Sequence, residues 1–142
     1  MNILICRVRY PNDPTNNTEA HQHFVGTYQN NTLILYTISS VNGKYDRVYD
    51  KNGNVREEIY LLNGAKQRQC NLVTASFIDC SKSYRIDLDN TIDISRLTNR
   101  NIPSNIINEI NININALKKL GKHTEYSINK LEFKRLNSRC VI

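Results

Sequence analysis

The sequence predicts a mainly β protein of the α+β class, a small and strongly bent β-barrel followed by one main C-terminal helix. Two observations lead to this prediction. β-branched and aromatic residues gather in many short runs between residues 2 and 88, and turn residues separate the runs. The later segment 104–120 instead spaces its apolar residues along one face of a helix. Strands that precede a helix, without alternation between the two, favour a barrel over a parallel sheet.

Three strands are expected in the N-terminal part of the chain. Residues 2–10 form the first, which ends at the proline-rich turn 11–14. Residues 24–28 and 32–40 are two further β-prone runs. The sequence Gln29-Asn30-Asn31 between them predicts that they form a hairpin.

A charged ribbon is expected after a turn at residues 41–44. Residues 45–50 and 54–62 are β-prone and flank Asn52-Gly53, which is the strongest short signal for a hairpin. We expect this ribbon to project from the body of the protein. The segments that follow are expected as a basic loop and two short strands: residues 63–71, 72–79 and 84–88.

One helix is predicted together with both of its ends. Ser104 follows Pro103 and is a suitable N-cap, and Gly121 is a suitable C-cap. Four apolar side chains share one face between them: Ile106, Ile110, Ile114 and Leu117. The tail is basic and contains one short element around residues 126–136. We expect a single domain, 1–142, with a basic C-terminal extension from about residue 122.

Charge and cysteine content restrict the class of protein. The chain has 19 basic and 13 acidic residues, a net charge of +6, which attracts polyanions or simply keeps a protein solvated. The four cysteines, at positions 6, 70, 80 and 140, lack the spacing of a zinc site. The apolar start of the chain is too short for a signal peptide or a membrane span. We therefore expect a cytoplasmic protein with reduced thiols, in which Cys140 is exposed.

Histidines and hydroxyl residues are the candidates for chemistry. His21 and His23 would share one strand face, as a metal pair without a third ligand or as surface histidines. His23 is also a candidate acid–base group, because an ordinary histidine pKa near ~6.5 suits neutral pH. Ser39 and Ser40 end a predicted strand, where hydroxyls either bond their own backbone or bind a ligand. No glycine-rich phosphate loop and no metal motif occurs, so no cofactor is expected.

Basic residues and tyrosines alternate in the middle of the chain. Tyrosine rings can stack on unpaired bases, and basic side chains can follow a phosphate backbone. Core packing and solvated surface explain the same residues without a ligand. The tyrosines in question are Tyr45, Tyr49, Tyr60 and Tyr84.

Several segments follow one another in an informative order. They are an apolar strand with an aromatic-proline step and an acidic turn at residues 3–13, then Gln22-His-Phe-Val-Gly26, Leu35-Tyr-Thr-Ile-Ser-Ser40, Ser76-Phe-Ile-Asp79, and Thr91-Ile-Asp-Ile-Ser-Arg-Leu97 before the helical region 102–120. Over roughly residues 2–120 this order resembles the MazF/PemK-type toxins of toxin–antitoxin systems, with the ToxN-like endoribonucleases as a related variant.

The resemblance implies both a fold and an activity. The fold is an SH3-like, MazF-type barrel with a C-terminal helix, usually a homodimer. The activity is metal-independent cleavage of single-stranded RNA, inhibited by a cognate antitoxin that is either protein or RNA. In such chemistry the 2′-hydroxyl attacks the adjacent phosphorus, which requires a base, a proton donor for the leaving oxygen and positive charge. The family uses an Arg at the start of its second strand and a Thr or Ser at the end of its third.

The family's residues carry over only in part. Ser39 stands at the Thr position with Ser40 beside it, but Gln22 stands where the family has Arg. The missing group is then expected from His23, from Arg7 or Arg9, or from an arginine of the charged ribbon. The predicted catalytic set is His23, Ser39, Arg7 and Arg9. The predicted RNA-binding set is Ser40, Lys44, Arg47, Arg56, Lys66, Arg68, Lys82 and Arg85.

The absent Arg also supports a second hypothesis, a catalytically degenerate barrel that binds RNA or protein. A structural phage or plasmid protein of unrelated fold is the third. Cleavage of labelled RNA, as opposed to binding alone, separates the first hypothesis from the second.

Overall fold

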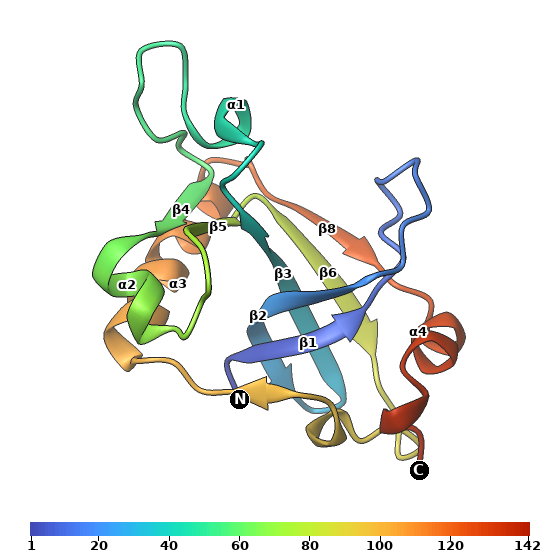
Figure 1. Cartoon of the computed structure of the whole chain (residues 1–142). Coiled ribbons are helices and arrows are strands. Elements are labelled where there is room, and N and C mark those ends of the chain that lie inside the picture. The colour runs from blue at the N-terminus through green and yellow to red at the C-terminus, as the bar shows by residue number, and fades with distance from the viewer.

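A computed structural model describes all 142 residues as a mixed α+β fold with a mostly antiparallel, eight-stranded sheet (Figure 1). The strands are β1 (Ile3–Arg7), β2 (Ala20–Gln29), β3 (Thr32–Ser40), β4 (Ile59–Leu62), β5 (Ser76–Asp79), β6 (Lys82–Asp87), β7 (Asn99–Arg100) and β8 (Thr124–Ser127). The helices are α1 (Tyr45–Val48), α2 (Gly64–Gln69), α3 (Ser104–Lys119) and α4 (Lys130–Leu136), and two 3₁₀ turns are η1 (Ile94–Arg96) and η2 (Ser138–Cys140).

The sheet is organised around the long strand β3. Its main path runs β4-β5-β3-β2-β1-β7, while β6 also pairs with β3, and β8 pairs with β6. β5 and β6 both run antiparallel to β3, with Ser39 opposite Phe77 and Leu35 opposite Tyr84. They therefore act as one strand that is interrupted near Asp79. β1 lies across the direction of β6 in Figure 1, so the sheet is strongly bent. The pairings leave it open between β4 and β7, whereas a closed barrel was expected.

The hairpin of β2 and β3 confirms its sequence signal. Asn30 and Asn31 both have positive φ, 52° and 60°, which is the conformation of a type I′ turn. Asparagine tolerates this left-handed region better than other residues with a side chain do. The two strands leave the turn with Thr27 opposite Ile34. A register shift between Val25 and Thr27 then places Val25 opposite Leu35 and His23 opposite Thr37.

The charged ribbon predicted around Asn52-Gly53 is wrong as a two-stranded hairpin. Residues 45–48 form α1, and only the isolated bridge of Tyr49 with Val55 remains of the expected pairing. Asp50 Oδ1 accepts hydrogen bonds from the backbone N–H groups of Asn52 (2.9 Å) and Asn54 (3.0 Å). Such local bonds compete with a strand ladder. The loop that results does project from the body (Figure 1).

Three other boundaries differ from the prediction. Residues 64–69 of the expected basic loop form α2, and the strand expected from residue 72 begins only at Ser76. The segment 91–97, which the resemblance likens to a short strand of the family, contains the turn η1, where the Asp93 side chain accepts a hydrogen bond from the Ser95 backbone N–H. A side chain that caps a tight turn in this way replaces the bonds that a strand would make.

Helix α3 confirms the predicted helix. Ile106, Ile110, Ile114 and Leu117 are buried, as their spacing requires. The N-cap position is Pro103, so Ser104 is the first helical residue and does not cap the helix with its side chain. At the other end Gly121 has φ +68°. Its N–H donates to Lys118 O (3.1 Å) and the N–H of Lys122 donates to Leu117 O (2.9 Å), the bond pair of a Schellman motif.

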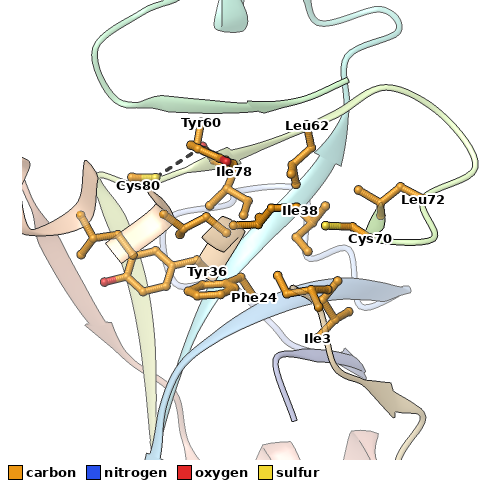
Figure 2. Packing of buried hydrophobic residues seen from close by; sticks show 14 of the residues in the cluster. Ile3, Phe24, Tyr36, Ile38, Tyr60, Leu62, Cys70, Leu72, Ile78 and Cys80 are labelled. Atoms are coloured by element: carbon orange, nitrogen blue, oxygen red, sulfur yellow. Dashed lines mark hydrogen bonds between the residues drawn. The ribbon is translucent and has the colours of Figure 1, made fainter. Parts of the chain in front are cut away.

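Two large apolar clusters lie on opposite faces of the sheet. One joins α3 to side chains such as Ile3, Phe24 and Tyr36 (Figure 2). The other joins β1, β2, β3 and β6 to the C-terminal tail, with Leu4, Leu35, Ile86, Phe133 and Cys140 among its members. Alternation along the strands explains the division, because successive side chains point to opposite faces.

The tail is part of the second cluster. β8 pairs in parallel with β6, and Phe133 of α4 is fully buried. The Asn137 side chain accepts a hydrogen bond from the Arg7 backbone N–H and donates one to the Arg7 carbonyl oxygen, each 2.8 Å long. Cys140, expected to be exposed, is buried beside this contact. None of the helices is both long and apolar enough to cross a membrane.

Truncation of a buried side chain on α3 tests how this helix packs against the sheet. Ile110 is 0% exposed, whereas Ile112 on the same helix is 69% exposed. We expect Ile110→Ala to lower the free energy of unfolding by about 2–5 kcal/mol, and Ile112→Ala to change it by less than about 0.5 kcal/mol. Urea unfolding followed by circular dichroism measures both. Equal effects of the two variants would contradict the assigned helix face.

Candidate functional site

The face of the sheet that carries the second apolar cluster becomes polar at one end. On β3 the face carries Leu33 and Leu35 in the cluster and then continues with Thr37 and Ser39. On β6 it carries Ile86 in the cluster, and Tyr84 and Lys82 lie beyond it. Because side chains two residues apart share a face, the polar residues extend the same surface. They line a cleft beside the cluster.

The cleft has a volume of about 390 Å³ and a mostly polar lining. It lies between the start of β2, the end of β3, the loop after β1, α1 and the interruption between β5 and β6. Its lining side chains belong to Tyr10, Asn12, Asp13, Pro14, Asn17, His21, Thr37, Ile38, Ser39, Lys44, Arg47, Asp79, Lys82 and Tyr84.

The end of one strand ladder opens the cleft. β2 and β3 are paired as far as His23 opposite Thr37. Before that point β2 continues along β1, and after it β3 continues along β5. The two strands therefore part, and His21 on β2 and Ser39 on β3 line the space between them.

Two cations without an acidic partner enter the cleft from α1. Lys44 and Arg47 are three residues apart on this single turn, and neither has a carboxylate oxygen within the 4.0 Å of an ion pair. The Arg47 guanidinium lies 5.3 Å from the centroid of the Phe77 ring, and Phe77 is the cross-strand partner of Ser39. Partial burial and the nearby Arg47 charge lower the pKa of Lys44. An anion between the two cations would relieve their repulsion.

A third cation, Lys82, is partly balanced. Its Nζ lies 3.8 Å from Asp79 Oδ2. The other oxygen of this carboxylate, Oδ1, accepts hydrogen bonds from the Ser81 backbone N–H (3.0 Å) and hydroxyl (2.6 Å). The carboxylate is thus fixed at the edge of the cleft, and the charge available to a ligand comes mainly from Lys44 and Arg47.

His23 lies behind the cleft and not in it. Its side chain is 0% exposed, with Nε2 2.5 Å from Tyr10 Oη and Nδ1 3.5 Å from Cys6 Sγ. Burial, with a smaller contribution from His21, lowers the pKa of His23 to about 4. The imidazole is therefore neutral at pH 7. It holds Tyr10 in the cleft wall and supplies no positive charge to a ligand.

Arg7 and Arg9 also lie outside the cleft. They alternate with the buried residues Cys6 and Val8 and so point away from the second cluster. Arg7 Nη1 donates to Thr18 O (3.1 Å), and Arg9 pairs with Glu132 of α4. Neither supplies the cation that the resemblance requires at the site.

The predicted RNA-binding residues divide into two groups. Lys44, Arg47 and Lys82 line the cleft together with Ser39. The others lie elsewhere: Ser40 beside Thr74, Arg56 bonded to the Asp46 carbonyl, Lys66 paired with Glu109, Arg85 paired with Asp87, and Arg68 exposed on α2. Gln22 points to the opposite face, where Arg100 Nη2 donates to its Oε1 (2.5 Å).

From the sequence, His21 is expected only as a metal ligand or a surface residue and is not in the predicted catalytic set, yet it is the only histidine in the lining of the cleft. The alternation of side chains between the two faces of a strand was the signal that could have pointed to His21. His21 and His23 share a face, and the residue nearer the strand end is the one that the ladder leaves uncovered. The thiols are unsuited to nucleophilic chemistry, because all four cysteines are buried and burial raises the pKa of Cys6 and Cys80 to about 12.

Comparison with known proteins adds no identification. No protein-family model matches the chain, and no curated protein matches it. Within the structure, no group of three or more His, Cys, Asp or Glu side chains is placed to hold a metal ion. The function therefore has to be argued from the cleft itself.

The burial of His23 predicts an acid-labile fold. Because the pKa of His23 is lower in the folded protein, the unfolded chain binds a proton at this histidine before the folded protein does, as the pH falls below about 6.5, the ordinary histidine value. Stability is then lost between that pH and about 4. Between pH 7 and 4.5 we expect His23 alone to account for roughly 2–3 kcal/mol. Urea unfolding at both pH values, on the natural protein and on His23→Gln, measures this share.

Carboxylates contribute equally to both proteins, so the difference between the two pH dependences isolates His23. A His23→Gln variant that loses as much stability on acidification as the natural protein would show that the imidazole is not buried in its neutral form.

Proposed function

We propose that the cleft binds single-stranded RNA and cleaves it without a metal ion, as a toxin-type endoribonuclease of the MazF/PemK kind. One observation carries the proposal. A histidine, a strand-end hydroxyl and two unpaired cations converge in one cleft, as His21, Ser39, Lys44 and Arg47. These are the groups that cleavage of a phosphodiester by its own 2′-hydroxyl requires.

His21 is assigned to the first proton transfer. It accepts the proton of the 2′-hydroxyl as that oxygen forms a bond to the adjacent phosphorus. The bond from phosphorus to the 5′-oxygen of the next nucleotide breaks, and this oxygen leaves with a proton. The products are a 2′,3′-cyclic phosphate and a 5′-hydroxyl. Because the nucleophile is the neighbouring 2′-hydroxyl, no water is consumed in this step.

Lys44 and Arg47 are assigned to the negative charge and to the leaving group. The lowered pKa of Lys44 makes its ammonium a readier proton donor for the 5′-oxygen. Arg47 lies over the ring of Phe77, which is the cross-strand partner of Ser39, and both Arg47 and Ser39 line the cleft, so both can bond the phosphorane oxygens. In this assignment Arg47 takes the place of the Arg that Gln22 replaces in the family pattern.

The proposal extends to fold and partners. The bent sheet is taken as an opened form of the SH3-like barrel that the resemblance implies, and the protein as a cytoplasmic homodimer. A cognate antitoxin, protein or RNA, would inhibit it by occupying the cleft. The net charge of +6 supports a polyanionic ligand, since phosphate contacts dominate the affinity of such complexes.

A catalytically degenerate barrel that binds RNA or protein is the alternative. The observation that favours it is the contact of Gln22 with Arg100 on the far face, which leaves the family's arginine position without a cation at the cleft. Such a module would use the same cations to bind RNA and would leave it intact.

Removal of the cleft histidine separates the two functions. We expect the natural protein to cleave labelled single-stranded RNA in the presence of EDTA and to leave 2′,3′-cyclic phosphate ends. His21→Ala should lower the rate roughly 10²- to 10⁴-fold, the usual contribution of a general base, while RNA binding persists. Gel analysis and end-group mapping of the products measure both quantities.

His123→Ala is the matched control, because that histidine bonds Tyr36 Oη (3.0 Å) outside the cleft. It should cleave at the natural rate. Cleavage by His21→Ala at the natural rate would overturn the assignment, and binding without cleavage by the natural protein would establish the alternative. The double variant Lys44→Ala/Arg47→Ala should weaken RNA binding whether or not the protein cleaves RNA.

A further inference from the structure

A second cavity lies beside the cleft, and the C-terminal tail forms one side of it. Its volume is about 320 Å³. One side comes from the segment that follows β1, and the other from the end of β8 and from α4. We call it the tail cavity, and its lining includes Val8, Tyr10, Ser127, Ile128, Asn129 and Phe133.

The tail cavity adjoins the cleft. Tyr10 and Asp13 line both, so that the Tyr10 side chain forms the wall between them. This wall is fixed from behind by His23. Asp13 is fixed as well, because its Oδ1 accepts hydrogen bonds from the Thr15 N–H (2.9 Å) and hydroxyl (2.8 Å). A molecule that extends out of the cleft past Tyr10 enters the tail cavity.

The two hollows differ in charge. The cleft contains the unpaired cations Lys44 and Arg47. In the tail cavity the one basic side chain, Arg9, is paired with Glu132, and the other charged lining residue is Asp13, so no unpaired cation is present. The accessible apolar surface comes from the partly exposed Tyr10, Ile128 and Leu136, whereas Val8 and Phe133 are buried behind it. The cleft therefore suits a phosphate, and the tail cavity suits a neutral group with apolar faces.

Polar groups at the rim of the tail cavity suit the edge of a flat ring. Ser127 and Asn16 are exposed residues in its lining, and a hydroxyl and an amide can each donate and accept hydrogen bonds. Unpaired bases in RNA are held in this manner, with their faces against apolar or aromatic side chains and their edges hydrogen bonded.

From these observations we propose that the tail cavity receives the nucleobase of a nucleotide whose phosphate lies in the cleft. The inference rests on the proposed function only in that it places a phosphate there, and it gives the C-terminal tail a role in base selection. Tyr10 then separates the base from the phosphate and offers its ring to the base.

Nucleoside monophosphates test this without any need for cleavage. We expect AMP, GMP, CMP or UMP to shift the backbone amide NMR signals of Ser127 and Ile128 as well as those of the cleft, while ribose 5-phosphate shifts the cleft signals alone. At least one nucleotide should bind roughly tenfold or more tightly than ribose 5-phosphate, the gain expected from stacking of one base.

Matched substitutions on β8 locate the effect. Ser127→Trp adds an indole at the tail cavity and should remove the preference for nucleotides, with ribose 5-phosphate binding unchanged. Glu125→Trp adds the same bulk on the same strand outside the lining of the cavity and should keep the preference. Circular dichroism checks that both variants fold.

Equal affinities of all four nucleotides and ribose 5-phosphate would overturn the inference while leaving a phosphate-binding cleft. The inference is also overturned if Ser127→Trp and Glu125→Trp have the same effect on the preference for nucleotides over ribose 5-phosphate. A preference for one base in a protein that cleaves no RNA would keep this inference and reject the nuclease, so the two proposals fail separately.

Discussion

The register of β3 is the constraint on which the rest of the structure depends. Its odd-numbered residues face the second apolar cluster and then the cleft, from Leu33 and Leu35 to Thr37 and Ser39. A shift of one residue would turn Ser39 to the other face and place Ile38 or Ser40 at its position. The two asparagines at positive φ in the hairpin, Asn30 and Asn31, and the register shift between Val25 and Thr27 together set this register. The turn and this shift thus decide which hydroxyl lies beside the cations.

Every other part of the candidate site is attached to that strand. Phe77 pairs with Ser39 and lies under Arg47, so α1 is placed by the same ladder that places the hydroxyl. Tyr84 pairs with Leu35 and contacts the ring of Tyr10, with 4.7 Å between the ring centroids. Tyr10 in turn is fixed by the buried, neutral His23. The cleft and the tail cavity therefore share a wall whose position follows from core packing.

The sequence predicted those parts of the structure that local patterns determine. The hairpin of β2 and β3 and the helix α3 are of this kind, because turn residues and a four-residue apolar stripe specify them without reference to the rest of the chain. The segment around Asn52-Gly53 had an equally strong signal, yet local bonds from Asp50 favoured a loop. The tail could not be placed, since β8 and α4 are stabilised by long-range contacts such as that of Asn137 with Arg7. The cleft was predicted in part. Ser39, Lys44, Arg47 and Lys82 were named, but choosing His21 over His23 required knowing where the ladder of β2 and β3 ends.

The proposed site requires that a single phosphate binds between His21, Ser39 and the cations Lys44 and Arg47. A crystal structure with a short single-stranded 2′-deoxy oligonucleotide tests it most directly, because this ligand keeps the phosphates and lacks the attacking hydroxyl. We predict a phosphate within hydrogen-bonding distance of Ser39 Oγ and the Arg47 guanidinium, with the His21 ring beside the adjacent sugar. An oligonucleotide bound on another face, with the cleft left to solvent, would contradict the claim.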